Sequence, residues 1–499
     1  MKILLIYPPV SVCGEGKVSP HMPLGLAYIA STLEKNNYEV KIVDALAMGK
    51  DIVKRKGKIT QIGLSDAMIK KEIIKFKPEV VGISVMFTAF KDDAYRMAKI
   101  VKSIDNKILT IFGGAHVSID VREVLKNKEV DVAVKGEGED TFIKLLKVIE
   151  RKGDLNDVLG ISFKKGRKII ETKMNPMIKN LDDLPFPARH LLPMNLYDDK
   201  KSKFSIAHPA MTMITSRGCP NHCVYCSIHS VWEHKWRGRS AKNVVDEIEE
   251  MVNKYKAKEI AFLDDSMSVD KRRMNEICDQ IIKRKIKFYW TTPNGIAHWT
   301  LDKKLLKKMK KAGCYRITFG IESGNLEMRR WVGKPFSLKQ AKELTQYANK
   351  IGMWTIATNI IGFPYETREQ IEDTVKFAID SDVDFALFYR LGVRKGTPIY
   401  EIFKKEKWLP TNEKELFSEE VCCETKNFKG DDLFKIQNEI YSKFLKRRIK
   451  SFLNPIRIIR KIHSVNDFKY VVGLGIAGLK LTKNLVTSKK GVTSKSLRV

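Results

Sequence analysis

The chain contains two successive series of short β-branched segments separated by amphipathic segments. In the first 150 residues the predicted strands are Ile3–Tyr7, Glu39–Val43, Val80–Val85, Ile108–Phe112 and Val130–Val134. The amphipathic segments predict intervening helices at Leu24–Asn36, Ala67–Phe76, Ala89–Ser103 and Glu139–Glu150. Strands that are apolar on both faces and alternate with helical crossovers indicate a doubly wound parallel sheet. A short hairpin, Ile161–Lys164 and Lys168–Glu171, follows this sheet.

A second alternation begins near residue 211. Its predicted strands are Met211–Thr215, Glu259–Leu263, Phe288–Thr291, Arg316–Gly320, Trp354–Ile360 and Phe385–Tyr389. Helical stretches such as Ala241–Tyr255 and Leu338–Ile351 separate them. Six β/α units in about 200 residues predict a partial barrel rather than a complete eight-stranded one, with its site at the carboxyl ends of the strands.

The length of 499 residues, 43% of them hydrophobic, exceeds what one core accommodates. The predicted fold class is therefore α/β, with a doubly wound parallel sheet, a partial (β/α)6 barrel and a basic helical C-terminal segment. The expected domains are 1–155, a hairpin and Pro-punctuated linker at 156–205, the barrel at 206–415, and the C-terminal region at 416–499.

The chain is strongly basic, with 91 Lys and Arg against 59 Asp and Glu and a formal net charge of +32. Residues 435–499 hold 16 of these basic residues and only 2 acidic ones, with apolar residues among them: Phe444, Leu445, Ile449, Phe452, Leu453, Ile456, Ile459 and Ile462. This pattern suits a helix in an anionic membrane interface, divided by Pro455, but equally a helical cap on the barrel with a solvated Lys face. Nucleic-acid binding is less favoured because no recognition module accompanies the charge. The final residues, TSKKGVTSKSLRV, are expected to be disordered.

Nothing in the sequence predicts a signal peptide or a membrane-spanning helix. Eight cysteines in such a chain indicate thiols or metal ligands in a reducing compartment rather than a disulfide framework. We therefore expect a cytoplasmic protein, with peripheral membrane contact as the option that the basic C-terminus leaves open.

The segment SRGCPNHCVYCS follows the first predicted barrel strand and contains Cys219, Cys223 and Cys226. Three thiolates at this spacing can each bind one iron of a cubane and leave the fourth iron open, whereas a closed cluster takes four cysteines. The alternative is a tetrahedral zinc site completed by His222 or His229.

The cysteine triplet, with Tyr225 directly before its last member, resembles the signature of the radical S-adenosylmethionine (SAM) superfamily. The resemblance implies a [4Fe–4S] cluster that reductively cleaves SAM and generates a 5′-deoxyadenosyl radical. Three further segments resemble the family in the family's order: FLDDSMS, ITFGIESGN and IIGFPYET. They imply contacts to the SAM amino group by Asp264 and Asp265, to its carboxylate and ribose by Glu322 and Ser323, and to its adenine by Gly362 and Pro364.

The N-terminal half resembles the cobalamin-binding domain that is fused to radical SAM barrels in anaerobic magnesium-protoporphyrin monomethyl ester cyclases and cobalamin-dependent radical SAM methylases. The segments that carry this resemblance are LLIYPP, MPLGLAYIA, FGGAHVS and VKGEGE. Doubly wound sheets bind ligands beyond the carboxyl ends of their strands, and glycines there let backbone approach a flat macrocycle. The implied cobalamin contacts are Pro8, Pro9, Ser84, Gly113, Gly114, His116, Gly136 and Glu137.

One motif of histidine-ligated cobalamin domains, D-x-H-x-x-G, is absent from the sequence. In this half only His21 and His116 lie near predicted strand ends, so either could be an axial ligand. Cobalamin bound without a histidine, and a domain that kept the fold but lost the cofactor, are the other interpretations.

Several patterns are expected to carry no chemistry. GLGIAG at 473–478 matches a dinucleotide motif without the βαβ unit that the motif requires. Trp290 and Trp299 could line a substrate cavity, although core packing is the favoured role. The remaining cysteines read as ordinary thiols: Cys13, Cys278, Cys314, Cys422 and Cys423.

The sequence thus predicts a radical SAM enzyme that methylates an unactivated carbon of a tetrapyrrole, lipid or other apolar metabolite, supplied with electrons by a ferredoxin or flavodoxin type of donor. Oxidative cyclisation or oxidation of a tetrapyrrole-like substrate is the alternative reaction. A tRNA methylthiotransferase would carry three further N-terminal cysteines, and only Cys13 lies in the first 200 residues. The non-enzyme alternative is a cobalamin-binding sensor with a vestigial barrel.

Overall fold

The computed structural model describes residues 1–14, 18–199, 205–334, 336–410, 423–452 and 454–474. The chain forms two compact units. The first comprises Met1–Asp199 with Ser230–Glu233, and the second comprises Lys200–His229 with His234–Val499.

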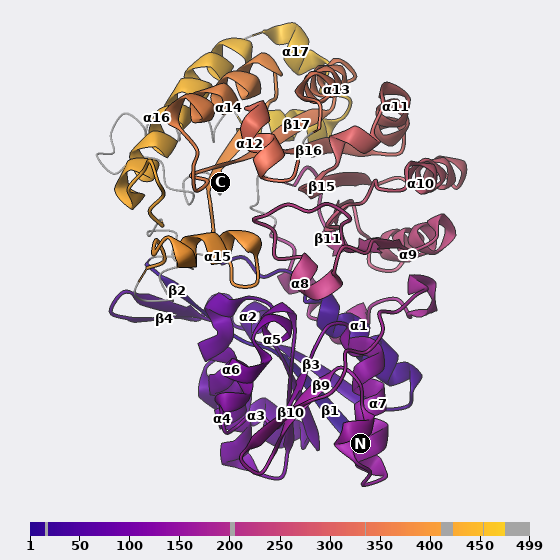
Figure 1. The fold of residues 1–499 in the computed structure, drawn as a ribbon. Coiled ribbons are helices and arrows are strands. Elements are labelled where there is room, and N and C mark those ends of the chain that lie inside the picture. Colours follow the sequence, from indigo (N-terminus) through magenta and orange to yellow (C-terminus); the bar gives the residue numbers. More distant parts are fainter. Residues whose placement is uncertain (15–17, 200–204, 335, 411–422, 453, 475–499) are drawn as a thin grey trace. The chain divides into compact units, whose positions relative to one another are not determined.

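The first unit, coloured indigo to magenta in Figure 1, is built on a seven-stranded sheet. The strand order is β10-β9-β8-β7-β6-β1-β3. Five strands are parallel: β1 (Lys2–Tyr7), β3 (Glu39–Asp44), β6 (Val80–Ser84), β7 (Leu109–Gly113) and β8 (Val132–Val134). The predicted hairpin is present as β9 (Ile161–Lys165) and β10 (Lys168–Glu171), which extend the sheet antiparallel. In such a sheet the strand order reverses beside β1, so the doubly wound prediction is confirmed and its switch point lies between β1 and β6.

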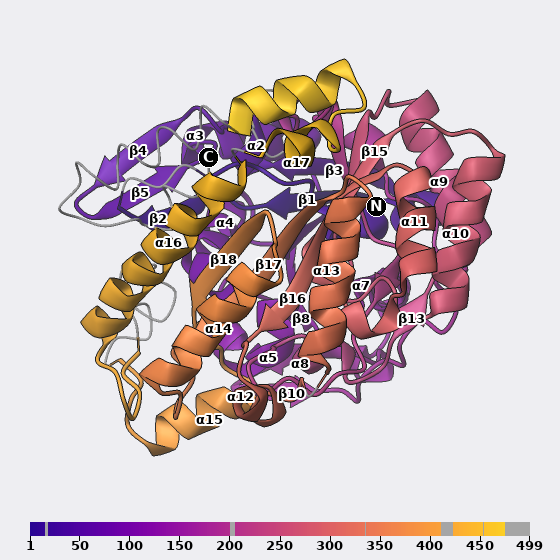
Figure 2. The ribbon, with the colours of Figure 1, turned by 90° about the horizontal axis from the view of Figure 1, so that it is seen from above.

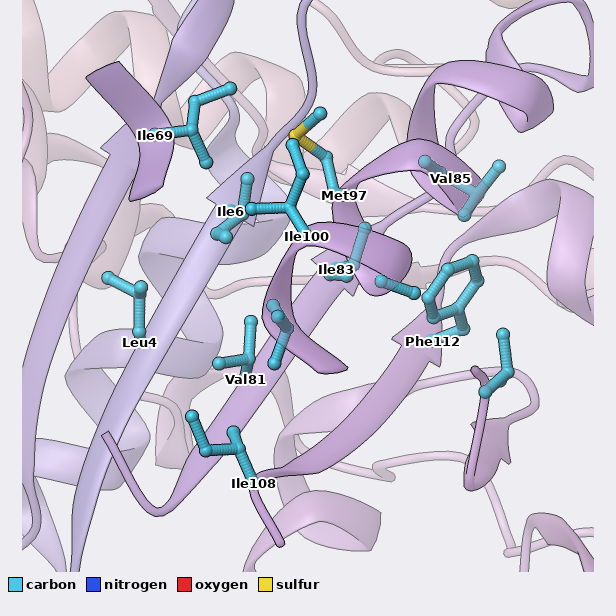
Figure 3. Close-up of a cluster of buried hydrophobic side chains, with 14 of the residues drawn as sticks. Leu4, Ile6, Ile69, Val81, Ile83, Val85, Met97, Ile100, Ile108 and Phe112 are labelled. Atoms are coloured by element: carbon cyan, nitrogen blue, oxygen red, sulfur yellow. The ribbon is translucent and has the colours of Figure 1, made fainter. Parts of the chain in front are cut away.

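Helices cover both faces of this sheet. The helices are α1 (Leu24–Lys35), α2 (Ala45–Met48), α3 (Asp66–Phe76), α4 (Lys91–Ile104), α5 (Ala115–Ile119), α6 (Val121–Lys126) and α7 (Gly138–Glu150). Figure 3 shows one face of the core, where Ile6 and Ile83 from the strands meet Met97 and Ile100 of α4 and Ile69 of α3. On the opposite face α1 and α7 contact each other. These strands are therefore buried on both sides, which is why they read as continuous apolar runs.

A small antiparallel sheet was not anticipated from the sequence. It pairs β2 (Val10–Cys13), β5 (Ile59–Ile62) and β4 (Val53–Lys56). All four residues of β4, Val-Lys-Arg-Lys, are exposed. A strand with no buried face lacks the apolar alternation that predicts strands, which explains the omission.

The second unit contains six parallel strands in the chain order β11-β14-β15-β16-β17-β18, as a partial barrel requires. Their bounds are β11 (Ala210–Met213), β14 (Glu259–Phe262), β15 (Tyr289–Ile296), β16 (Cys314–Glu322), β17 (Trp354–Ile361) and β18 (Phe385–Arg390). The crossover helices are α9 (Ala241–Asn253), α10 (Lys271–Lys283), α11 (Lys303–Lys311), α13 (Leu338–Lys350) and α14 (Arg368–Asp380). All six predicted strands are present, so the predicted fold class is confirmed.

Each of these crossover helices begins at a residue whose side chain accepts a hydrogen bond from the first turn. The caps are Ser240, Asp270, Asp302, Ser337 and Thr367, and Thr367 forms a capping box with Gln370. Such caps satisfy otherwise unpaired backbone N–H groups. The caps therefore fix where each strand-to-helix loop ends, and these loops carry the candidate site.

Shorter elements complete the second unit. They are β12 (Ser216–Arg217), α8 (His229–Trp232, whose last three residues group with the first unit), β13 (Arg237–Gly238), α12 (Leu326–Trp331), α15 (Pro398–Lys405), α16 (Gly430–Phe452) and α17 (Pro455–Ile459). Residues 465–474 are also helical. Figure 2 shows α16 running beside α14, and α16 also contacts β18, where Phe444 packs against Phe388.

Candidate functional site

The cysteine loop lies beyond the carboxyl end of β11 and begins directly after the two-residue strand β12. Cys223 is buried, and Cys219 and Cys226 are half-buried. Burial raises the pKa of all three thiols, that of Cys226 to about 12. Within the described ranges, no group of three or more His, Cys, Asp or Glu side chains lies in an arrangement that could hold a metal ion. The ligand role of the three cysteines stays a prediction.

The histidines of this loop are stacked on one another. The ring of His234 lies 3.8 Å from that of His222 and 3.9 Å from that of His229, centroid to centroid. His234 Nδ1 also lies 3.2 Å from the carbonyl oxygen of Asn221. A zinc site would instead need one imidazole nitrogen directed at the thiolates. The stack therefore gives the zinc interpretation no support.

Asp264 and Asp265 follow β14 but differ in their contacts. Asp264 is buried and accepts hydrogen bonds from the Thr215 backbone, the Thr215 hydroxyl at 2.7 Å and the Ser216 hydroxyl. These hydrogen bonds stabilise the turn that leads into the cysteine loop. Asp265 is solvent-accessible and accepts a hydrogen bond from the Gly218 N–H at 3.2 Å. Desolvation of the carboxyl group by the surrounding protein, together with the charge of Asp264, raises its pKa to about 6. Of the two, Asp265 has the carboxylate that a ligand could reach.

Glu322, the last residue of β16, connects the barrel to the cysteine loop. Its φ is +65°, a conformation that non-glycine residues adopt at a cost of about 1–3 kcal/mol and that is concentrated at functional sites. The buried carboxylate lies 2.6 Å from Lys334 Nζ and accepts a hydrogen bond from the Tyr225 hydroxyl. The Cys223 thiol can donate to the Tyr225 oxygen. A continuous polar chain therefore runs from the lysine through the carboxylate and phenol to a predicted cluster ligand.

Ser323 faces away from this chain. It is fully buried, its hydroxyl lies 3.3 Å from Thr374 Oγ1, and it accepts a hydrogen bond from the Asn325 N–H. These contacts fix the start of α12 against α14. Its predicted contact to SAM stays a prediction, and Glu322 is the member of the pair that contacts Tyr225.

Gly362, Phe363 and Pro364 form a tight turn at the end of β17. Gly362 has φ +84°, where a side chain would be strained, and its N–H donates to Glu366 Oε2 at 2.7 Å. Pro364 is buried. The Phe363 ring lies 6.0 Å from the ring of Tyr225. The structure thus brings the predicted adenine turn and the cysteine loop together through an aromatic contact.

Three buried polar residues of this region were missed by the sequence analysis: His298, Arg329 and Glu366. Arg329 of α12 is fully buried, and its Nη1 and Nη2 have no acceptor among the described residues. Burial lowers its pKa to about 10, although Glu322 and Tyr225 oppose this. Glu366 Oε1 likewise has no donor among the described residues, and burial raises the pKa of Glu366 to about 8. For His298, burial lowers the pKa to about 3.

The two tryptophans that the sequence left open have different surroundings. Trp290 is fully buried and donates to the carbonyl oxygen of Ala312 at 2.9 Å, so it is part of the core as expected. Trp299 follows β15 and stacks on Phe336, with ring centroids 3.5 Å apart. Lys334 lies 6.0 Å from the Trp299 ring, which places this aromatic pair beside the polar chain.

In the first unit, most of the predicted cobalamin contacts lie at the carboxyl edge of the sheet. Pro8 and Pro9 follow β1, Ser84 ends β6, Gly113 ends β7, and Gly114 begins α5. A Cβ at Gly113 would meet nothing within 4 Å, whereas one at Gly114 would lie 2.7 Å from the Val85 carbonyl oxygen. Met86 and Phe87, directly after β6, are exposed. Open backbone next to exposed apolar side chains at a switch point suits a flat macrocycle.

The remaining predicted contacts are engaged within the unit. His116 is buried, with Nδ1 3.1 Å from Thr88 Oγ1 and Nε2 3.6 Å from a Glu123 carboxylate oxygen. The Gly136 N–H donates to Ser118 Oγ, and Glu137 accepts a hydrogen bond from the Ile178 N–H at 2.7 Å. His21 is exposed. Nε2 of His116 has no hydrogen-bond partner among the described residues, and axial ligation by His116 stays a prediction.

Comparison with known proteins finds a matching family model in each of the two units. The family model described as the radical SAM superfamily matches residues 213–378, and the one described as the B12 binding domain matches residues 17–146. A protein of Pyrococcus horikoshii named as an uncharacterized methyltransferase is 33% identical over 484 residues, covering 96% of this chain and 98% of its own length. The chain belongs to the radical SAM superfamily.

Two further similarities agree with this radical SAM assignment. Cytidylyl-2-hydroxyethylphosphonate methyltransferase of Streptomyces wedmorensis is 31% identical over 78% of this chain and 79% of its own length. The solved structure of the radical SAM enzyme OxsB with aqua-cobalamin and SAM bound has the same fold, with a TM-score of 0.69 at 16% identity over 99% of this chain and 74% of that one. Other relatives include anaerobic magnesium-protoporphyrin IX monomethyl ester cyclases. The predictions of a radical SAM enzyme and of a B12-binding domain are confirmed.

The residues of this radical SAM protein fit the cofactors of its superfamily. Three thiols in one loop suit a cluster with an open iron, and the unpartnered nitrogens of buried Arg329 suit an anion bound beside Glu322. In the first unit, the open backbone at Gly113 suits a corrin ring. No described helix is long and apolar enough to cross a membrane.

Proposed function

We propose that this protein is a cobalamin-dependent radical SAM methyltransferase that acts on an unactivated carbon of a small molecule. The observation that carries the proposal is similarity across both units, over 96% of the chain, to a protein named as a methyltransferase. The phosphonate methyltransferase named above supports the same reaction class.

In this proposal Cys219, Cys223 and Cys226 hold the [4Fe–4S] cluster. When bound, the cluster supplies the electron that cleaves SAM and thereby generates the radical that takes hydrogen from the substrate. The protein's own part is to orient SAM. Asp265 would receive its amino group, and the Gly362–Pro364 turn would receive its adenine.

The SAM carboxylate is the anion that we place beside Lys334 and Arg329. Lys334 is already paired with Glu322, whereas both terminal nitrogens of Arg329 lack an acceptor in the described part of the chain. Leaving such buried donors unpaired costs about 1–3 kcal/mol, and more for a charged group. A carboxylate in this position would recover that free energy.

The carboxyl edge of the first unit would hold cobalamin, which supplies the methyl group when bound. Gly113 and Gly114 present backbone there, and Met86 and Phe87 present apolar surface. The burial of His116 favours binding without a histidine ligand from this residue.

The substrate class follows from the relatives' names and is part of the proposal. These include a hopanoid C-3 methylase and the magnesium-protoporphyrin cyclases, so a lipid, tetrapyrrole or similar apolar metabolite is favoured. The electrons would come from a ferredoxin or flavodoxin type of donor. Oxidative cyclisation is the second candidate reaction because a cyclase of Rubrivivax gelatinosus is 29% identical over 77% of the chain.

Anaerobic reconstitution with iron, sulfide, SAM, cobalamin and a reductant tests the proposal. We expect S-adenosylhomocysteine to form beside 5′-deoxyadenosine, because each methyl transfer consumes a second SAM. Formation of 5′-deoxyadenosine alone, with cobalamin present and a substrate turned over, would favour the cyclase.

The cluster assignment has its own control. Cys219→Ala should lose both the [4Fe–4S] absorption and SAM cleavage, whereas Cys278→Ala removes a buried thiol of α10 and should retain both. A Cys219→Ala protein with a full cluster spectrum and SAM cleavage would show that the triplet is not the ligand set.

A further inference from the structure

The basic residues from the last turns of α16 onward, at positions 446–474, fall into two groups. The inner group is paired with two acidic residues that precede β18. Arg448 lies 2.7 Å from Asp382, Arg457 lies 2.8 Å from Asp384, and Lys461 lies 2.6 Å from Asp384. Asp384 and Lys461 are fully buried. These three cations therefore attach the segment to the barrel through two carboxylates.

The outer group has no such partners. Lys446, Arg447, Arg460 and Lys469 are exposed, and none of the four forms an ion pair with a described residue. Between residues 446 and 474 the sequence has a single acidic residue, Asp467, which is buried and accepts hydrogen bonds from the His463 N–H and the Ser464 hydroxyl. The solvent side of this segment is thus purely cationic.

Large apolar side chains accompany these cations. The exposed apolar residues are Ile449 (44% exposed), Ile456 (59%), Ile459 (66%), Val465 (69%), Phe468 (56%) and Val472 (46%). We call these six residues, together with Lys446, Arg447, Arg460 and Lys469, the outer face. Val465, Phe468 and Val472 follow the i, i+3, i+7 spacing of one helical stripe. Asp467 and Tyr470 of the same helix are buried, and the Tyr470 hydroxyl oxygen accepts a hydrogen bond from Nη1 of buried Arg316 at 3.1 Å.

The helix 465–474 therefore has apolar residues on both its buried and its exposed side. Its inner side packs into the cluster formed by Tyr315, Trp354 and Tyr470, while its outer side is also apolar. Packing against the barrel explains the inner side only. An exposed apolar stripe with cations among its residues is typical of an interaction surface.

We propose that the outer face docks this protein on an anionic membrane surface. Apolar side chains interleaved with Lys and Arg, and without acidic residues, are what a helix in the headgroup region requires. No described helix is long and apolar enough to span, so the contact is peripheral. The proposal is independent of the reaction, because it concerns residues at the C-terminal segment and not the cysteine loop.

The charge and the apolar residues of the outer face argue against a second copy of this chain and against nucleic acid as its partner. A second copy of this chain would bring an identical cationic face, and like charges opposed across an interface are unfavourable. Nucleic acid would satisfy the cations, but it would leave Ile459, Val465 and Phe468 exposed to the phosphates or to water. Anionic lipid satisfies both kinds of side chain at once.

Flotation of the full-length reconstituted protein with lipid vesicles tests the proposal. We expect binding to phosphatidylcholine vesicles that contain 30% phosphatidylglycerol and little binding to pure phosphatidylcholine, with the binding weakened by salt. Each basic residue near such a surface contributes enough for the charge reversal Arg460→Glu/Lys469→Glu to lower the partition coefficient about tenfold or more. Val465→Ser/Val472→Ser should also lower it.

Matched controls lie elsewhere in the chain. Lys339→Glu/Lys376→Glu changes the net charge by the same amount at exposed lysines of α13 and α14, and Met68→Ser/Ile74→Ser removes exposed apolar side chains of α3. Both controls should bind vesicles as the unaltered protein does, and all four variants should retain SAM cleavage, which shows that they fold. Equal losses in variants and controls would overturn the proposal. So would an unaltered protein that does not float with anionic vesicles, or one that dimerises through this face instead.

Discussion

At the scale of single residues, Arg329 distinguishes a ligand site from a structural core. Its guanidinium is fully buried, yet Nη1 and Nη2 have no acceptor among the described residues. Only Nε is paired, as the donor of a hydrogen bond to the Lys334 carbonyl oxygen at 3.2 Å. A buried charge whose terminal nitrogens lack acceptors is unfavourable, so an apolar residue of similar size is expected to stabilise the ligand-free protein. If SAM supplies the missing acceptor, the same substitution must weaken SAM binding. The substitution is therefore expected to raise the stability of the ligand-free protein and to lower its affinity for SAM.

The corresponding prediction concerns Arg329→Met. We expect a melting temperature equal to or above that of the unaltered protein without SAM, and a smaller increase when SAM is added. Lys334→Met is the comparison, because its ammonium is paired with Glu322, and this variant should be less stable without SAM. Differential scanning fluorimetry under anaerobic conditions measures both quantities. An Arg329→Met protein that is destabilised and keeps the full SAM-dependent increase would assign the guanidinium a structural role.

Glu366 gives a prediction about pH. Burial raises its pKa from 4.5 to about 8, and Oε2 accepts the Gly362 N–H. Because the folded pKa exceeds the unfolded one, the contribution of Glu366 to stability is complete below about pH 4.5 and is lost as the pH rises to about 8. The slope between these values is at most about 1.4 kcal/mol per pH unit.

Glu366→Gln removes this titration and keeps an oxygen that can accept from the Gly362 and Phe363 N–H groups. The variant should therefore match the unaltered protein near pH 5 and exceed it in stability at pH 8, as judged from denaturant midpoints at both values. A difference between the two proteins that does not change with pH would contradict a protonated Glu366.

At the scale of elements, the ion pairs around Asp384 hold the C-terminal segment on the barrel. Asp384 precedes β18 and is fully buried between Arg457 and Lys461. Removing one member of a buried pair costs about 3–5 kcal/mol, because the other charge stays buried without a partner. Asp384→Asn should accordingly lower the free energy of unfolding by about that amount. Asp380→Asn, at the exposed end of α14, is the control and should change it little.

Hydrogen exchange shows where that loss is located. Amides of α16 and α17 should lose protection in Asp384→Asn while those of the strands β11 and β14 keep theirs, because α16 contacts α14 and β18. Uniform loss of protection across the second unit would show that the segment and the barrel unfold together.

How far the sequence predicted these elements depends on the signal that each one carries. Strands such as β6 and β17, apolar or alternating over five or more residues, were placed within a few residues of their bounds. The exposed strand β4 carries no such pattern and was missed. The cysteine loop and Glu322 were found through motifs, whereas Arg329, next to another arginine on the short helix α12, looks in sequence like a surface charge. Only the packing of α12 reveals that one of these two side chains is buried.

At the scale of the whole molecule, two units with separate cofactor edges predict separable activities. The barrel contains the cysteine loop, Glu322 and the Gly362 turn, and the first unit contains the open carboxyl edge at Gly113. If cobalamin lies on that edge, filling it should stop methyl transfer and leave the cleavage of SAM unaffected. Cleavage and transfer can therefore be tested in one protein.

Gly113→Val makes this test without disturbing the fold. A Cβ at Gly113 meets nothing within 4 Å, and replacing a strand glycine is expected to stabilise the unit by about 0.5–1 kcal/mol. The added side chain would occupy the space in which we place the corrin ring. Cobalamin binding, measured by the absorbance that copurifies or is retained after gel filtration, should fall at least tenfold.

The products then show whether the units act separately. Gly113→Val should still form 5′-deoxyadenosine, because that step needs only the barrel, but little S-adenosylhomocysteine. Gly25→Ala, where a Cβ on α1 also meets nothing, is the matched control and should retain both products. If Gly113→Val binds cobalamin normally, the corrin ring lies elsewhere. If it loses both products while its melting temperature is unchanged, SAM cleavage itself depends on bound cobalamin, and the two units work as one catalyst.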